Sequence, residues 1–189
     1  MQSKTVLQPG SDEWLSYRSN KIGASDAPII MGVSPWKSPR KLYEEKLGLS
    51  VNETTYPMRR GTAMEEPARK QFMEDNWIIV EPKLMEHPKY EWMIATMDGI
   101  SEDHSCAVEI KCPGKKDHQT AVDGQIPEKY VPQLQHQMEV CGLDWIFYYS
   151  FDGKDGVTLK CHRDQQYIDL LLSMELKFWV CMQTFMPPD

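Results

Sequence analysis

The chain has 189 residues, a formal net charge of −7 and 41% hydrophobic residues, which is typical of a one-domain globular protein with a proper core. It contains no run of about 18 apolar residues and no basic-then-apolar start, so we expect neither a transmembrane helix nor a secretory signal. The five cysteines are odd in number and form no CxxC pair, which argues against a disulfide framework or structural zinc and favours a reducing cytoplasm.

The first predicted elements are two short helices. Ser11, followed by two acidic residues, predicts the cap of a helix that carries Arg18. Ser25 or Asp26 predicts the cap of a second helix that ends at Gly32. A helix start offers free backbone N–H groups to a phosphate, and Arg18 can supply further donors. The alternative is an ordinary cap beside a surface arginine.

Two further helices and a strand follow. A Ser-Pro start and a glycine stop predict a helix over residues 38–48. A longer helix is expected over 58–77, with Glu65 near the border of its buried face. Residues 78–81 are expected to form a strand that Pro82 stops.

The last third alternates between polar and apolar stretches. Residues 114–127 indicate a loop, and a helix is expected from residue 127 or 128 to about residue 141. Two strands over 145–151 and 157–161 follow, joined by an Asp-Gly turn. Asp164 then caps a final helix. The pattern as a whole predicts an α/β fold with helices flanking a mixed sheet.

The stretch 90–111 organises these elements. Two apolar, β-branched runs flank a short polar turn, which predicts an antiparallel hairpin. Asp98 closes the first run beside Gly99, where a backbone and a ligand can approach closely. Strand side chains alternate between faces, so Glu109 and Lys111 project together, with Asp98 opposite. Two carboxylates and an ammonium group can hold a divalent cation and a water beside a phosphodiester.

This chemistry fits Mg²⁺, which accepts hard oxygen ligands and assists phosphodiester hydrolysis. Asp98 and Glu109 supply such oxygens, and the Ile110 carbonyl lies between Glu109 and Lys111. Lys111 can orient the attacking water or steady developing charge. An acidic chain argues against a general nucleic-acid binder but less against a metal nuclease, because bound cations neutralise its ligands.

The pattern Asp98 … Glu109-x-Lys111 resembles the core of the PD-(D/E)xK nucleases, and the string Glu-Ile-Lys-Cys-Pro resembles their lambda-exonuclease-like branch, the YqaJ-like viral recombinase family. Met97 stands where the superfamily name places proline. The resemblance covers roughly residues 10–183 and implies a restriction-endonuclease-like core in a single exonuclease domain over residues 1–189. Other landmarks occur in the family's order: Trp14-x-x-x-Arg18, Gly-Ala-Ser25, Arg60-Gly-Thr-Ala-Met-Glu65 and Val-Pro-Gln133-Leu-Gln135-His-Gln-Met.

For the metal, the resemblance implies that Asp98 and Glu109 are direct ligands, joined by the Ile110 carbonyl. Glu65 would act through the water shell of the metal. The implied cofactor is Mg²⁺, with Mn²⁺ able to substitute and two ions at the site.

For the substrate, the resemblance implies that Lys111 acts on the attacking water and that Gln133 helps to position it. Gln135 is the alternative to Gln133, because it lies nearer the middle of the same helix. Arg18 and Ser25 would hold the 5′-phosphate of the strand being degraded.

The family resemblance further implies 5′→3′ digestion of one strand of duplex DNA from a 5′-phosphorylated end. The product is a 3′ overhang for a single-strand annealing protein in phage-type recombination. A ring-shaped homotrimer is expected, without membrane contact, in the cytoplasm of a bacterial host if the chain is phage or prophage encoded. The alternatives are a restriction- or repair-type endonuclease on the same core, and a DNA-end-binding module with a vestigial metal site.

Overall fold

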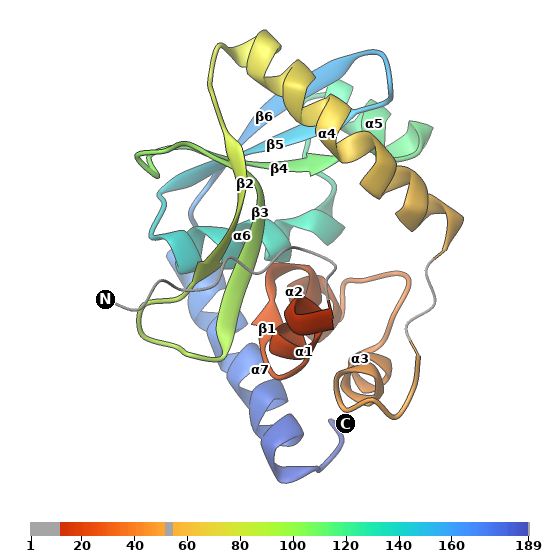
Figure 1. Cartoon of the computed structure of the whole chain (residues 1–189), viewed down its shortest axis with the longest axis vertical. Helices are drawn as coiled ribbons and strands as arrows, with labels where there is room; N and C mark the ends of the chain where they lie inside the picture. The colour runs from red at the N-terminus through yellow and green to blue at the C-terminus, as the bar shows by residue number, and fades with distance from the viewer. Residues whose placement is uncertain (1–11, 52–54, 189) are drawn as a thin grey trace.

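A computed structural model describes residues 12–51 and 55–188 as one mixed, six-stranded sheet with helices on both faces (Figure 1). The α/β class expected from the sequence is confirmed. The elements are, in chain order, α1 (Asp12–Ser19), β1 (Ile22–Gly23), η1 (Ala24–Asp26), α2 (Ala27–Ile30), α3 (Pro39–Lys46), α4 (Tyr56–Asn76), β2 (Glu81–Glu86), β3 (Met93–Ile100), β4 (Ala107–Lys111), α5 (Lys115–Val122), η2 (Glu128–Tyr130), α6 (Val131–Cys141), β5 (Trp145–Phe151), β6 (Gly156–His162) and α7 (Gln165–Thr184).

Strand β3 is the centre of the sheet and forms the expected antiparallel hairpin with β4. Strand β2 runs antiparallel along one edge of β3. The other edge is shared, because β1 pairs in parallel with its start at Met93 and Ile94, and β4 pairs with its end at Gly99 and Ile100. Beyond β4 the order continues with β5, parallel, and β6, antiparallel.

The two faces of the sheet carry different helices. Helix α4 covers one face, where its Phe72 packs in a core with Val108 and Ile110 of β4. On the other face lies α6, whose Leu134 and Met138 join a larger core that includes part of α7. Since strand side chains alternate, Glu109 and Lys111 project on the α6 side.

Several helix ends agree with the sequence analysis. The Ser38 hydroxyl accepts a hydrogen bond from the Lys41 N–H at 3.3 Å and caps α3. Gly142 ends α6 with a φ of 66°, in the left-handed region that favours glycine. Asp164 caps α7 by accepting from the Tyr167 N–H at 3.0 Å. No helix in residues 12–51 and 55–188 is long and apolar enough to cross a membrane.

The predicted end of a strand at Pro82 is wrong. Pro82 lies inside β2, and the strand predicted for residues 78–81 is instead Glu81–Glu86. In the described chain β2 pairs only with β3, so it is an edge strand, where proline is tolerated. The register also shifts between Glu81 and Lys83, so no pairing in the ladder requires the missing N–H of Pro82.

The helix predicted to begin at Ser25 or Asp26 is also different. The backbone forms the 3₁₀ turn η1 and then only the four residues of α2, and the Asp26 side chain does not cap α2. Buried Asp26 instead accepts from the Gly23 N–H at 2.9 Å and pairs with the Lys46 ammonium at 2.7 Å. Its side chain stabilises the turn and the contact with α3. The predicted cap Ser11 lies outside the described residues.

The loop predicted over residues 114–127 contains helix α5. Gly114 occupies its N-cap position without a side-chain cap, so the usual polar signal for a helix start is missing. Tertiary contacts contribute instead: His118 of α5 hydrogen-bonds Ser150 of β5 at 2.9 Å.

Candidate active site

Two acidic strand residues lie where β3 and β4 separate. Their ladder pairs Ile100 with Ala107 and Gly99 with Val108, and Asp98 and Glu109 come next on the two strands. Beyond this point the Asp98 Oδ2 accepts a hydrogen bond from the Ile110 N–H at 2.8 Å. A side chain therefore takes the place of a backbone partner at the fork.

A β-bulge aims Asp98 at this fork. Between the pairs Glu81–Ile100 and Lys83–Met97, β2 advances two residues while β3 advances three. The extra residue disturbs the alternation of β3, so that Met97 and Ile100 both join the α6-side core. Bulges of this kind often re-aim a side chain next to an active site.

Gly99 lies within the same bulge, and the space around it leaves no room for a side chain. A Cβ atom at this position would lie 2.5 Å from Val80 Cγ2 and 2.9 Å from Val108 Cγ1. Both neighbours are core side chains, so any other residue would have to displace Val80 or Val108 next to Asp98.

Four polar side chains converge on the α6 side. Glu109 is 1% exposed, and its Oε1 accepts from the Lys111 ammonium at 2.5 Å and from Gln133 Nε2 at 2.6 Å. Lys111 also donates to the Gln133 carbonyl oxygen at 3.0 Å. Gln137 Nε2 donates to Glu109 Oε2 at 2.5 Å.

Gln137 was not foreseen from the sequence. It lies one helical turn after Gln133, so the two amides share a face of α6 and clamp both oxygens of Glu109. That four-residue spacing is the signal that could have identified it.

Gln135 serves another part of the fold. Its Oε1 accepts from the Asp164 N–H at 3.0 Å, and its Nε2 donates to the His162 carbonyl at 2.9 Å. It therefore joins α6 to the junction of β6 and α7. The neighbouring His136 is buried between the Glu175 carboxylate, 2.7 Å away, and the Ile94 carbonyl, 2.9 Å away. The two hydrogen bonds of His136 orient α6, which carries Gln133 toward Glu109.

The charges of the site are unevenly balanced. Burial and the adjacent Glu109 carboxylate raise the pKa of Asp98 well above its usual value. Burial lowers the pKa of Lys111, but the carboxylates of Glu109 and Asp98 outweigh it and raise the net value. Lys111 is therefore an ammonium at neutral pH, while burial and a neighbouring carboxylate disfavour the charged form of Asp98.

Glu65 lies on the other side of Asp98, on α4. Its side chain is 41% exposed and pairs with Arg69 Nη1 at 3.5 Å. The same Arg69 nitrogen donates to the Asp98 carbonyl at 3.0 Å, which ties α4 to β3. Glu65 makes no direct contact with Asp98 or Glu109 in the described structure, and its charge contributes to the raised pKa of Asp98.

The donor set suits a hard cation that keeps part of its water shell. Within residues 12–51 and 55–188, no three His, Cys, Asp or Glu side chains converge closely enough to enclose a metal. Asp98 and Glu109 nevertheless offer carboxylate oxygens. The N–H and C=O of a strand residue point to the same edge, so the Ile110 carbonyl faces the edge where its N–H meets Asp98. Mg²⁺ characteristically binds one or two carboxylates and retains waters.

Arg18 and Ser25 also lie together. The Arg18 guanidinium donates to the Ser25 hydroxyl, and it covers the Trp14 ring at 5.0 Å from the centroid. It also lies against Gly23, where a Cβ would come within 3.3 Å of Arg18 Nη2. Gly23 pairs with Ile94, four residues before Asp98 on β3, which corresponds to about 13 Å along the strand. A helix-start contribution is excluded here, since α2 has only four residues.

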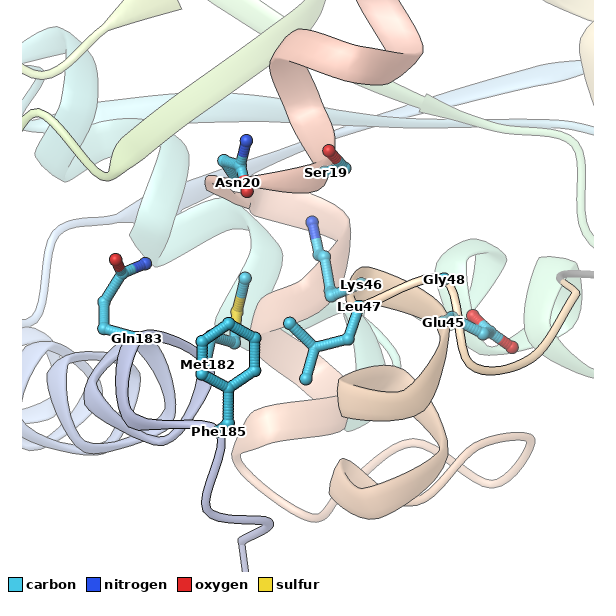
Figure 2. Close-up of a pocket in the computed structure, with 9 residues that line it drawn as sticks. All are labelled: Ser19, Asn20, Glu45, Lys46, Leu47, Gly48, Met182, Gln183 and Phe185. Atoms are coloured by element: carbon cyan, nitrogen blue, oxygen red, sulfur yellow. The ribbon is translucent and has the colours of Figure 1, made fainter.

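A cavity of about 490 Å³ lies elsewhere, between the ends of α1, α3 and α7 (Figure 2). Lys46, Met182 and Phe185 are among its lining residues. None of the predicted site residues lines it, so it is separate from the fork of β3 and β4.

A profile of the YqaJ-like viral recombinase domain matches residues 13–144. The chain belongs to this family. Its membership confirms the assignment made from the sequence motifs. The matched residues include Arg18, Asp98, Glu109 and Gln133, and therefore both the fork and the Arg18 cluster.

The YqaJ-like chain is also similar to individual proteins. The uncharacterised protein YqaJ of Bacillus subtilis strain 168 is 31% identical over 178 residues, which cover 89% of this chain and 55% of that protein. The chain thus spans about half the length of this curated relative. The alkaline exonuclease LHK-Exo of Laribacter hongkongensis matches with a TM-score of 0.79 and 25% identity, covering 93% of this chain and 94% of that one.

A phage-related exonuclease of Haemophilus somnus 129PT matches with a TM-score of 0.60 and 17% identity, over 88% of this chain and 96% of that one. At this identity the likeness concerns the fold alone. Together these matches confirm that the sheet and its helices form a restriction-endonuclease-like core.

Proposed function

We propose that this YqaJ-like chain is a Mg²⁺-dependent exonuclease that degrades one strand of duplex DNA in the 5′→3′ direction from a 5′-phosphorylated end. The observation that carries the proposal is the convergence of Asp98, Glu109 and Lys111 at the fork of β3 and β4. The similarity to a solved alkaline exonuclease over 94% of that chain supports it. A single PD-(D/E)xK exonuclease domain over residues 1–189 is part of the proposal.

Asp98, Glu109 and the Ile110 carbonyl would hold the metal directly, and Glu65 would contact it through water. Bound Mg²⁺ would neutralise phosphate charge and lower the pKa of an attacking water. The two neighbouring carboxylates of Asp98 and Glu109 at the fork of β3 and β4 support a resident cation. Mn²⁺ should substitute, and two ions at the site are consistent with the direct and water-mediated carboxylates.

Glu109 Oε1 already accepts two hydrogen bonds, whereas Oε2 accepts only that of Gln137 among the residues that the structure describes. The second lone pair of Oε2 is therefore the one available to a metal. Gln133 and Gln137 would hold the carboxylate so that this oxygen keeps its direction when DNA binds.

Lys111 would act as a positioned ammonium rather than as a base. Its pKa is raised, so it carries a proton at neutral pH that can be directed at the attacking water or at a phosphate oxygen. The Gln133 carbonyl oxygen restrains the ammonium at 3.0 Å.

Arg18 and Ser25 would bind the terminal 5′-phosphate. The guanidinium provides planar donors, and the exposed Ser25 hydroxyl adds a further donor at the same place. A terminal 5′-phosphate bound at a fixed position relative to Asp98 would determine which phosphodiester is cut. It would therefore also determine the direction of digestion.

The wider biology follows the family resemblance. We propose that the 3′ overhang is passed to a single-strand annealing protein during phage-type recombination in the bacterial cytoplasm. A ring-shaped homotrimer around the DNA suits a net charge of −7, since encirclement can replace tight electrostatic binding.

The test compares the native chain with Lys111→Ala on linear and covalently closed duplex DNA. We expect Mg²⁺-dependent release of nucleotides from linear DNA by the native chain, a large loss with Lys111→Ala, and no cutting of closed circles. Cutting of closed circles would favour an endonuclease. If the native chain and Lys111→Ala both release no nucleotides but still bind DNA ends, the result would favour an end-binding module.

A further inference from the structure

An exposed tryptophan lies near the candidate active site at the fork of β3 and β4. Trp36 follows α2 in the loop before α3, and 71% of its side chain is accessible. The Lys129 ammonium lies 4.6 Å from the centroid of its ring. Packing into the core does not explain why a tryptophan occupies this position, since most of the indole surface remains open to solvent.

A cavity of about 460 Å³ adjoins this loop. It lies between the loop, the first turn of α5 and η2, and it combines prolines with charged side chains. Its lining residues are Val33, Pro35, Lys116, Asp117, Pro127, Glu128 and Lys129.

Two aromatic contacts connect this cavity with the catalytic lysine. The Lys129 ammonium lies 5.3 Å from the centroid of the Tyr130 ring. The Lys111 ammonium lies 5.4 Å from the same centroid. Trp36 is therefore separated from Lys111 by only two side chains, Lys129 and Tyr130.

The charges of the cavity favour a neutral group inside it. The Asp117 carboxylate is offset by Lys129 at 2.6 Å and accepts from the Tyr130 hydroxyl at 3.3 Å. Glu128 on the same wall repels a phosphate, while exposed Lys116 can contact one at the rim. A nucleobase that stacks on Trp36 at the edge of the cavity, with its phosphate near Lys116, satisfies both conditions.

We propose that Trp36 and this cavity form a subsite in which a base of single-stranded DNA stacks next to the reacting phosphodiester. This inference rests on the proposed nuclease function. Lys129 orients the indole from one side, and the base takes its accessible surface. Stacking on an aromatic side chain tolerates any base, which suits a strand that is degraded without regard to sequence.

The experiment measures binding of a fluorescently labelled, single-stranded 12-nucleotide oligodeoxythymidylate by anisotropy, with EDTA present to prevent cleavage. Trp36→Ala should bind about tenfold more weakly than the native chain, whereas Trp36→Phe should retain most of the affinity. Trp77→Ala is the matched control, because Trp77 is 92% exposed and follows α4. Thermal unfolding of all variants reveals any loss of folding.

An abasic nucleotide locates the contact. One thymidine at a time is replaced by an abasic nucleotide. At one position this replacement should weaken binding to the native chain but should not weaken binding to Trp36→Ala any further. Equal binding by Trp36→Ala and Trp77→Ala would overturn the subsite, as would equal losses in Trp36→Ala and Trp36→Phe. If the native chain digests linear DNA while either result holds, only the subsite fails. If it neither digests nor binds DNA, the proposed function fails with it.

Discussion

Gln137 donates a hydrogen bond to Glu109 Oε2 at 2.5 Å, and both side chains are almost completely buried. The Gln137 carbonyl oxygen has no hydrogen-bond partner among the described residues, so the contact with Glu109 is the one that holds this amide. Gln137 is therefore a positioning residue for the proposed metal ligand.

Gln137→Leu should weaken metal binding by roughly 10- to 100-fold, as expected for loss of a group that orients a ligand. Titration calorimetry with Mg²⁺ and Mn²⁺ measures this directly. Gln135→Leu is the contrasting variant, because it breaks the bonds to Asp164 and His162 and should lower stability while leaving metal affinity near native. If both variants lose stability and metal affinity in proportion, Gln137 has no specific role at Glu109.

Arg18→Ala should reduce the preference for 5′-phosphorylated over 5′-hydroxyl duplex ends by roughly 10- to 100-fold, the range for loss of a charge-assisted hydrogen bond. Rates of digestion on the two substrates give this ratio. Arg40→Ala is the control, because Arg40 pairs with Glu44 on the surface of α3. An equal loss of rate on both kinds of end would remove Arg18 from phosphate recognition.

Gly99→Ala should destabilise the protein by about 1–3 kcal/mol and reduce nuclease activity further, because the new methyl group overlaps Val80 and Val108 beside Asp98. Denaturant unfolding and digestion rates separate the two effects. Gly61→Ala is the matched control, since its Cβ would meet nothing within 4 Å on α4 and should stabilise that helix by about 0.5–1 kcal/mol. Native-like activity of Gly99→Ala would show that the bulge tolerates a side chain.

The buried pair His136–Glu175 should make stability depend on pH. Burial lowers the pKa of His136, but the Glu175 carboxylate outweighs it and raises the net value above that of the unfolded chain. A raised pKa means that the folded state binds the proton more tightly. The contribution of His136 is therefore fully present below about pH 6.5 and is lost as pH rises through its folded pKa. Burial also raises the pKa of Glu175, which acts in the same direction, because it too makes the folded state bind a proton more tightly.

We expect the free energy of unfolding to fall as pH rises above about 6.5. The double variant His136→Gln with Glu175→Gln should fall less over the same range, because it lacks this titration. Urea unfolding at several pH values compares the two slopes. Parallel slopes would exclude His136 as the titrating group.

Local patterns predicted much of the fold. The helix caps Ser38 and Asp164 were predicted from the sequence and are present in the structure. Such a cap can be predicted because it depends only on neighbours about three residues away. Pro82 misled the prediction, since its place on an edge strand depends on which strands pair. Helix α5 was missed because Gly114 gives no polar cap signal.

The candidate site shows the same division. Strand alternation placed Glu109 and Lys111 together, and they form an ion pair. The bulge at Asp98 depends on the register with β2, which no local pattern reveals. Gln133 and Gln135 could be separated only when the partners of Gln135 on β6 and α7 were known.

The central claim is tested most directly with a 5′-phosphorylated duplex labelled at either the 5′ or the 3′ end of one strand. In Mg²⁺, the native chain should release the 5′ label first as a mononucleotide, while the 3′ label stays on a shortening strand. Glu109→Gln should abolish both changes, since it removes the charge of a proposed metal ligand. Earlier release of the 3′ label, or undiminished digestion by Glu109→Gln, would contradict the account.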